Sequence, residues 1–233
     1  MSRKKDIDLD LTGFAELFMN DEGRAESRLP RIYDIPLSEI DDFPNHPFKV
    51  KMDEDMNQLV QSVKERGVIT PITLRQKEDG RYEIVSGHRR RKACELAGLE
   101  RVPAEIKELS RDEAIILMVE SNLQRSIILP SEKAFSYKMR LEAMKRQGQR
   151  TDLTSTPLGQ KSGKYSVEVL GEQVGESRSQ IQRYIRLTEL IPEILEMVDN
   201  KKIAMRPAVE LSYLPKEEQE ILYDTMESED CTP

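Results

Sequence analysis

The chain has 233 residues, of which 34% are charged and 37% are hydrophobic, and its formal net charge is −7. No run of residues approaches the roughly 18 apolar positions that a membrane span needs, and the N-terminus lacks the apolar segment of a signal peptide. The cysteines, Cys94 and Cys231, lie too far apart in the sequence to indicate a disulfide scaffold or a zinc site. These features favour a helix-rich cytoplasmic protein without a membrane partner, and the net charge alone argues against nucleic acid.

The acidity, however, is confined to one end of the chain. Residues 1–190 contain 32 basic and 32 acidic side chains, whereas residues 191–233 contain 4 basic and 11 acidic ones. Residues 125–150 carry seven basic and two acidic side chains, a net charge of +5. Such a basic stripe is either a phosphate-binding face or a solvated helix face, so net charge does not exclude a nucleic-acid partner.

The first half of the chain predicts an α+β domain over residues 31–125, after a flexible polar segment at residues 1–30. Strands are expected at 35–40, 69–75, 81–85 and 102–106, and helices at 53–66 and 89–97. A turn at 77–80 makes a hairpin of the second and third strands.

The second half predicts an all-α domain over residues 126–226, followed by a tail at 227–233, so the chain is predominantly helical. Helices are expected at 110–121, 130–147, 166–174, 177–187, 193–198, 206–214 and 216–226. The helix at 130–147 would bury one face, made of Ala134, Tyr137, Leu141 and Met144. Residues 148–165 are rich in Gly, Ser, Thr and Pro, which predicts a loop or an insertion that orders on binding.

Residues 167–186 fit the template of a helix-turn-helix. Gly175 takes the turn position, which requires a positive φ, and Gly171 lets the second helix approach the first. The core between the helices would contain Leu170, Val174, Ile181 and Tyr184. The second helix would present to DNA the side chains of Ser177, Arg178, Ser179, Gln180, Gln182 and Arg183. A purely structural helix pair is the alternative, but the absence of Asp and Glu from Ser177 to Thr188 favours the DNA interpretation.

Two further segments carry groups that bind phosphate and metal. Gly87 joins a strand to a helix, and Arg89 and Arg90 follow it, an arrangement that suits a nucleoside triphosphate. The alternative is a basic helix start that contacts a nucleic-acid backbone or nothing. Glu120 and Asn122 in the segment ESNLQR are oxygen donors of the kind that hold Mg²⁺ beside phosphates; the alternative there is a helix end with polar caps.

Taken in order, four segments resemble the ParB/Noc family of chromosome and plasmid partition proteins. They are GVITPI (67–72), SGHRRRKA (86–93), ESNLQR with PSEKA (120–134) and the helix-turn-helix. The resemblance covers residues 32–214 and implies a ParB/sulfiredoxin-like α+β domain that binds CTP and Mg²⁺, then a helix-turn-helix domain that binds a palindromic parS-like site in double-stranded DNA. It also implies a homodimer that closes as a sliding clamp, a ParA-type ATPase partner, and association with the nucleoid or a plasmid.

The resemblance assigns roles to individual residues of this chain. Those bordering the base and sugar would be Gly67, Thr70, Pro71 and Ile72. Those at the phosphates would be Gly87, His88, Arg89 and Arg90. Those at the metal and triphosphate would be Glu120 and Asn122, with Arg125 beside them.

The chain also departs from the family pattern. His88 and Ser121 stand where Glu is usual, and Thr70 stands where Gln is usual, which leaves slow hydrolysis of CTP to CDP and phosphate open. We find no counterpart of the family's usual C-terminal dimerisation domain in this sequence, so we expect either a truncated chain or a protein that dimerises by another route, and the abrupt end favours truncation.

Two other functions stay open at this point: a helix-turn-helix transcriptional regulator with a ParB-like ligand domain, and a nucleotide-using enzyme on the same fold. Sulfiredoxin chemistry is disfavoured because its reactive Cys would directly precede His88, where this chain has Gly87.

Overall fold

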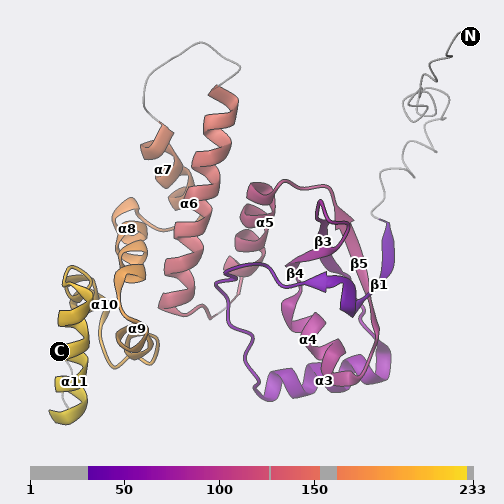
Figure 1. Ribbon diagram of the computed structural model, residues 1–233, viewed down its shortest axis with the longest axis horizontal. Helices are drawn as coiled ribbons and strands as arrows, with labels where there is room; N and C mark the ends of the chain where they lie inside the picture. Colours follow the sequence, from indigo (N-terminus) through magenta and orange to yellow (C-terminus); the bar gives the residue numbers. More distant parts are fainter. Residues whose placement is uncertain (1–30, 126, 153–161, 230–233) are drawn as a thin grey trace, which may run out of the picture.

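The computed structural model describes residues 31–125, 127–152 and 162–229, which form an α+β part followed by an all-helical part (Figure 1). The predicted fold class is therefore confirmed. The expected flexible segment at residues 1–30 and residues 230–233 lie outside the described residues. The tail expected at 227–233 is wrong at its start, because residues 227–229 continue the last helix. No helix among the described residues combines the length and the apolar character that a membrane span requires.

The α+β part contains one mixed sheet with the strand order β1-β5-β3-β4-β2. Its strands are β1 (Ile32–Pro36), β2 (Ile40–Asp41), β3 (Ile72–Gln76), β4 (Tyr82–Ser86) and β5 (Arg101–Lys107). Strands β3 and β4 form the predicted antiparallel hairpin, while β3 and β5 run parallel in the centre of the sheet.

Two predicted strands have different bounds in the structure. The strand expected at 35–40 is split by a 3-10 turn at Leu37–Glu39, because Pro36 has no N–H to continue a ladder. The strand expected from residue 69 begins at Ile72, because the carbonyl groups of Thr70 and Pro71 accept hydrogen bonds from the Arg90 side chain instead of from a strand.

Helices cover both faces of this sheet. Helices α3 (Glu54–Arg66) and α4 (His88–Ala97) pack on one face, and α5 (Arg111–Leu123) packs on the other. Neighbouring residues of β4 show the division: Ile84 lies in the core with α3 and α4, whereas Val85 lies in the core with α5, since successive strand residues point to opposite faces. Cys94 is buried in the first core, as expected for a small apolar residue.

The helical part is built around α6 (Pro130–Asp152), which stands between α5 and the two helices that follow it in the chain (Figure 1). The remaining elements are α7 (Ser162–Val174), α8 (Arg178–Arg186), the 3-10 turn η2 (Leu187–Glu189), α9 (Pro192–Asp199), α10 (Met205–Leu211) and α11 (Lys216–Glu229). Ala134, Tyr137 and Leu141 of α6 are buried as predicted, and Met144 is half-buried.

The segment expected to be a loop at 148–165 is helical at both of its ends. Helix α6 continues to Asp152 and α7 begins at Ser162, so the prediction of a loop is wrong at both ends of the segment. A single Gly lowers helix propensity by only about 1 kcal/mol, which neighbouring helix formers outweigh. Residues 153–161 between the two helices lie outside the described residues.

Helices α7 and α8 have the predicted helix-turn-helix geometry. Gly175 in the turn has a φ of 69°, and Ser177 accepts a hydrogen bond at its Oγ from the N–H of Gln180 at 3.2 Å. Leu170 and Ile181 are fully buried between the helices. A Cβ at position 171 would lie 2.7 Å from the backbone oxygen of Glu176, so only glycine permits this approach.

We expect Gly171→Ala to lower the free energy of unfolding of the helical part by about 1–3 kcal/mol, despite the better helix propensity of alanine, because the added methyl group overlaps a backbone oxygen. Urea unfolding followed by circular dichroism measures the change. Glu172→Ala, at the exposed neighbouring position, is the control and should change stability by less than about 0.5 kcal/mol. Equal stability of Gly171→Ala and the wild type would contradict the close approach.

Candidate functional site

The turn from β4 into α4 has the backbone geometry of an anion cradle. Gly87 is the N-cap of α4 with a φ of 101°, and no side chain caps the helix. A Cβ at this position would lie 2.7 Å from Cγ2 of Ile72, so the turn requires glycine for both conformation and space. The first N–H groups of α4 have no side-chain acceptor, and such groups attract phosphate or carboxylate oxygens.

The arginines that follow Gly87 have separate roles in this structure. Arg90 donates from Nη1 to the carbonyl oxygens of Thr70 and Pro71, at 2.6 and 2.5 Å, and so holds the loop that the family resemblance assigns to the base and sugar. Arg91 pairs with Asp42. Arg89 makes one long contact, from Nη2 to Oδ1 of Asp53 at 3.3 Å. Of the two arginines expected at the phosphates, Arg89 is therefore the one in position to bind a ligand directly.

Arg89 and Arg125 line one cavity of about 350 Å³ between the loop before α3, the start of α4 and the connection from α5 to α6. The other charged side chains around it are Lys49, Lys51, Asp53, Asp55 and Glu132. Burial lowers the pKa of Arg125, Glu132 opposes this, and the charge of Arg89 lowers the pKa further. An anion between the two guanidinium groups would relieve their mutual repulsion.

A nucleotide phosphate fits the donors around this cavity. The Nε of Arg89 is buried and has no hydrogen-bond partner among the described residues, and a buried N–H without an acceptor is costly. The loop carrying Lys49, Lys51 and Asp53 was not predicted as part of the site. Its only sequence signal was two lysines just before a helix N-cap, which is a common surface pattern.

His88, expected at the phosphates, lies outside this cavity. Its ring stacks on that of His46, with the centroids 3.7 Å apart, and the two rings line a separate cavity with Asp42 and Arg91. Burial lowers the pKa of His88 to about 3 and that of His46 to about 4. Both imidazoles are therefore neutral at physiological pH, and the pair acts as a packing element behind Gly87.

The residues expected at the metal are engaged elsewhere. Glu120 accepts a hydrogen bond at Oε1 from Nη2 of Arg140 at 2.6 Å, and Asn122 donates from Nδ2 to the carbonyl oxygen of Met118 at 2.8 Å. Glu120 lines a cavity of about 630 Å³ between α5, α6 and α7, and Arg125 borders this cavity as well as the smaller one. Across the described ranges, no three His, Cys, Asp or Glu side chains are grouped to hold a metal ion.

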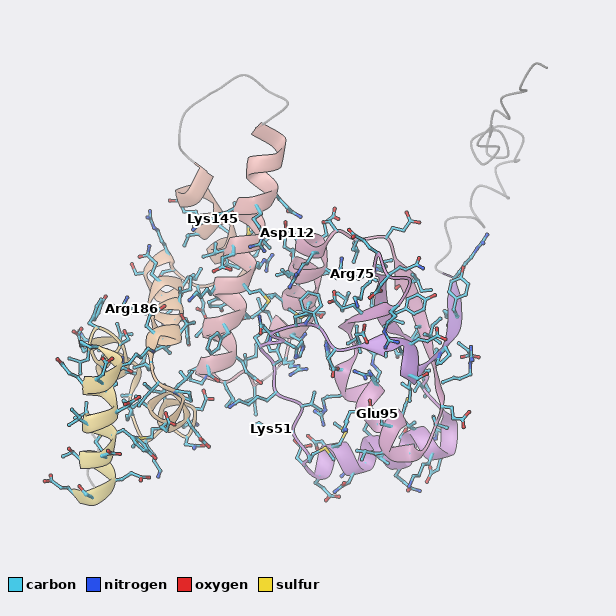
Figure 2. All side chains as sticks on the ribbon, viewed as in Figure 1. Lys51, Arg75, Glu95, Asp112, Lys145 and Arg186 are labelled. Atoms are coloured by element: carbon cyan, nitrogen blue, oxygen red, sulfur yellow. The ribbon has the colours of Figure 1, made fainter. Side chains whose placement is uncertain are left out.

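Helix α8 presents the side chains expected at DNA. Ser177, Arg178, Ser179, Gln182 and Arg183 are exposed, and Gln180 is half-buried. Arg178 lies 3.7 Å from a carboxylate oxygen of Glu168, whereas Arg183 forms no ion pair with the described residues. Arg186, the last residue of α8, instead points toward the end of α10 (Figure 2). There its Nε donates a hydrogen bond to Oγ of Ser212, and its guanidinium lies over the ring of Tyr213.

Two protein-family models together match most of the chain. Residues 21–123 match the ParB N-terminal domain and residues 141–232 match the ParB HTH domain. The chromosome-partitioning protein Spo0J of Thermus thermophilus is 32% identical over 83% of this chain and 66% of its own length. The nucleoid occlusion protein of Listeria innocua is 32% identical over 84% of this chain and 63% of its own length, so the chain spans less than two thirds of the length of either relative.

A solved Pnob8-like ParB-N domain shares the fold, with a TM-score of 0.52 at 15% identity, over 78% of this chain and 79% of that one.

The two stacked histidines predict acid destabilisation. Their pKa values of about 3 and about 4 lie below the ordinary value of 6.5, so as pH falls the unfolded chain binds protons first. Stability is therefore highest above pH 6.5 and falls progressively as the pH drops toward about 3. For His88 alone the loss at pH 5 is about 2 kcal/mol. Arg91 and Arg125 oppose protonation, whereas Asp42 and Glu132 favour it at His46.

Thermal unfolding of the wild type and of His88→Gln between about pH 7 and about pH 5 tests this prediction. The wild-type melting temperature should fall more steeply than that of the variant, which cannot titrate at this position. Parallel curves for the two proteins would show that His88 is not buried in its neutral form.

Proposed function

Because this chain belongs to the ParB family, we propose that it is a DNA-segregation protein whose α+β part binds CTP with Mg²⁺ and whose helix-turn-helix binds a palindromic, parS-like DNA site. We propose further that it works as a homodimer that closes as a sliding clamp on nucleoid or plasmid DNA in the cytoplasm, with a ParA-type ATPase as partner.

The observation that carries the nucleotide proposal is that Arg89, which follows the Gly87 turn, and Arg125, which follows α5, line one cavity. The uncapped N–H groups of α4 and the buried Nε of Arg89 supply donors, and the paired guanidinium groups supply charge for a triphosphate. Arg90 would act indirectly, by holding the Thr70–Pro71 loop that, with Gly67 and Ile72, borders the base and sugar.

Metal binding would require a rearrangement of the residues assigned to it. Glu120 would leave Arg140, and Asn122 would turn its amide away from Met118. A bound Mg²⁺ would offset charge on the phosphates, and Glu120 and Asn122 would supply oxygen ligands for it.

The DNA proposal rests on α8. Its exposed face combines arginine, glutamine and serine side chains, the types that contact base edges and phosphates in a major groove. Arg183 is the cation on this face without an ion-pair partner among residues 31–125, 127–152 and 162–229.

Arg89→Ala is expected to abolish CTP binding, because it removes a charge and the buried donor at the phosphates, while DNA binding persists. Titration calorimetry with CTP, ATP, GTP and UTP in the presence of Mg²⁺ measures the loss and the base preference. Lys92→Ala removes one charge from the exposed side of the same helix and should bind CTP normally. Binding of all four nucleotides with equal affinity would refute the CTP proposal and favour a nucleotide-independent DNA-binding regulator.

Arg183→Ala should have the reverse effect. It should weaken binding to a duplex selected from a random-sequence library, by about 1–3 kcal/mol if the side chain reads a base, or reduce the salt slope by about 1 if it contacts a phosphate. Fluorescence anisotropy at several salt concentrations distinguishes the two cases. Lys92→Ala again serves as the control of equal charge. Unchanged DNA affinity and salt slope in Arg183→Ala would show that α8 is not the DNA-contacting helix.

A further inference from the structure

Alternate side chains of the loop before α3 reach two different cavities. Lys49, Lys51 and Asp53 line the Arg89 cavity, the one of about 350 Å³ that Arg125 also lines, whereas the two residues between them line the cavity of the stacked histidines. This alternation is that of a locally extended chain, whose successive side chains point in opposite directions. Figure 2 labels Lys51 on this loop, just before α3.

The loop residues on either side of Lys51 are bound to other elements. The backbone N–H of Lys49 donates to Oε1 of Glu132 at 2.8 Å, and its Nζ lies 3.5 Å from Oδ2 of Asp199. Asp53 is the N-cap of α3 and accepts at Oδ1 from a backbone N–H of that helix at 3.0 Å. Because the backbone is held on both sides, Lys51 has a fixed place at the cavity while its side chain keeps its freedom.

Lys51 itself has no hydrogen-bond or ion-pair partner among residues 31–125, 127–152 and 162–229, and it is exposed. The carboxylates of the same cavity are not available to it. Asp53 pairs with Arg89 at 3.3 Å, and Glu132 accepts two backbone N–H groups. Asp55 is exposed and forms no ion pair within the same ranges. The Arg89 cavity therefore has a free ammonium group beside its two arginines.

The Arg89 cavity lies at the end of the proposed ligand that is remote from the base. None of residues 67–72, all of which the structure describes, lines this cavity, although the family resemblance assigns that segment to the base and sugar. The segment is held instead by Arg90, one position further along α4. A nucleotide with its base there would extend its phosphates along the start of α4 to Arg89, and its last phosphate would reach the loop of Lys51.

We propose that Lys51 binds the terminal phosphate of the nucleotide and so makes this chain select a nucleoside triphosphate over a diphosphate. The inference rests on the proposed nucleotide binding in the α+β part and involves no metal ion. The ammonium of lysine is a compact charge on a flexible four-carbon stem, which suits a phosphate at the edge of a cavity. Its charge-assisted hydrogen bond forms only when the third phosphate is present, since a diphosphate leaves the ammonium in solvent.

Nucleotides that differ by one phosphate test this assignment. Calorimetric titration of the full chain with CTP and with CDP, both in Mg²⁺, measures the gain in affinity from the third phosphate. Lys51→Gln should bind CTP about tenfold more weakly than the wild type and should bind CDP with wild-type affinity, because only the third phosphate meets the ammonium. Lys51→Arg keeps a positive charge at this position and should restore most of the CTP affinity.

Lys49→Gln is the matched control. It removes the same charge from the same loop, but its Nζ lies beside Asp199 instead of being free, and its backbone contact with Glu132 remains. This variant should change the affinities for CTP and CDP by the same factor, since its charge acts on every phosphate from a distance. Arg89→Ala should weaken both nucleotides, because its guanidinium would meet an inner phosphate.

The outcomes separate this inference from the proposed function. If the wild type binds neither CTP nor CDP, the proposed function fails and the inference fails with it. If the wild type binds CTP and CDP equally, Lys51 does not select a triphosphate. If Lys51→Gln keeps the wild-type preference for CTP, or weakens CTP and CDP alike, Lys51 does not bind the terminal phosphate, and nucleotide binding by the α+β part still stands.

Discussion

Helix α6 is packed into three hydrophobic cores at once, and the rest of the molecule depends on this shared burial. Ala143 lies in the core of α5 and β4, Tyr137 and Leu141 lie in the core of the helix-turn-helix, and Ala134 lies in the core of α9 to α11. Separating α6 from any of these cores would expose apolar side chains to water, and the folded state would lose stability in proportion to the exposed area. A movement of α6 must therefore disturb the packing of both parts of the chain.

Polar contacts strengthen the same connection at the start of α6. Glu132 is buried and accepts a hydrogen bond from the backbone N–H of Lys49 at 2.8 Å, and Asp199 of α9 accepts from both the N–H and the Oγ of Ser131. The loop beside the Arg89 cavity is thus held by the helical part. A ligand that enters this cavity and moves the loop has a direct mechanical path to α6 and α9.

Most of the fold followed from the sequence, because the signals were local, whereas the structure brings only Arg89 and Arg125 of the expected nucleotide residues to the cavity beside α4. The hairpin, the turn at Gly175 and the close approach at Gly171 depend on backbone requirements that particular residues meet. The helix extensions at 148–152 and 162–165 did not follow, since a Gly/Ser/Thr-rich composition only weakly opposes a helix. The hydrogen-bond and ion-pair partners of individual side chains could not be predicted from the sequence either, because the partners lie on elements that are distant in the chain.

Glu176 is one residue whose partners the sequence could not predict and whose surroundings matter for function. In the sequence it is an acidic residue in a helix-turn-helix turn, where an apolar residue is usual, and it has no local explanation. In the structure it is bound by Lys133, while the other residues of its cavity include Arg140, Glu120 and Arg125. The departure from the pattern thus places a carboxylate where the DNA-binding element meets the proposed nucleotide site. Because three cations and two carboxylates line one cavity, rearranging any one of them changes the electrostatic energy of the others, which is the physical condition for communication between the two sites.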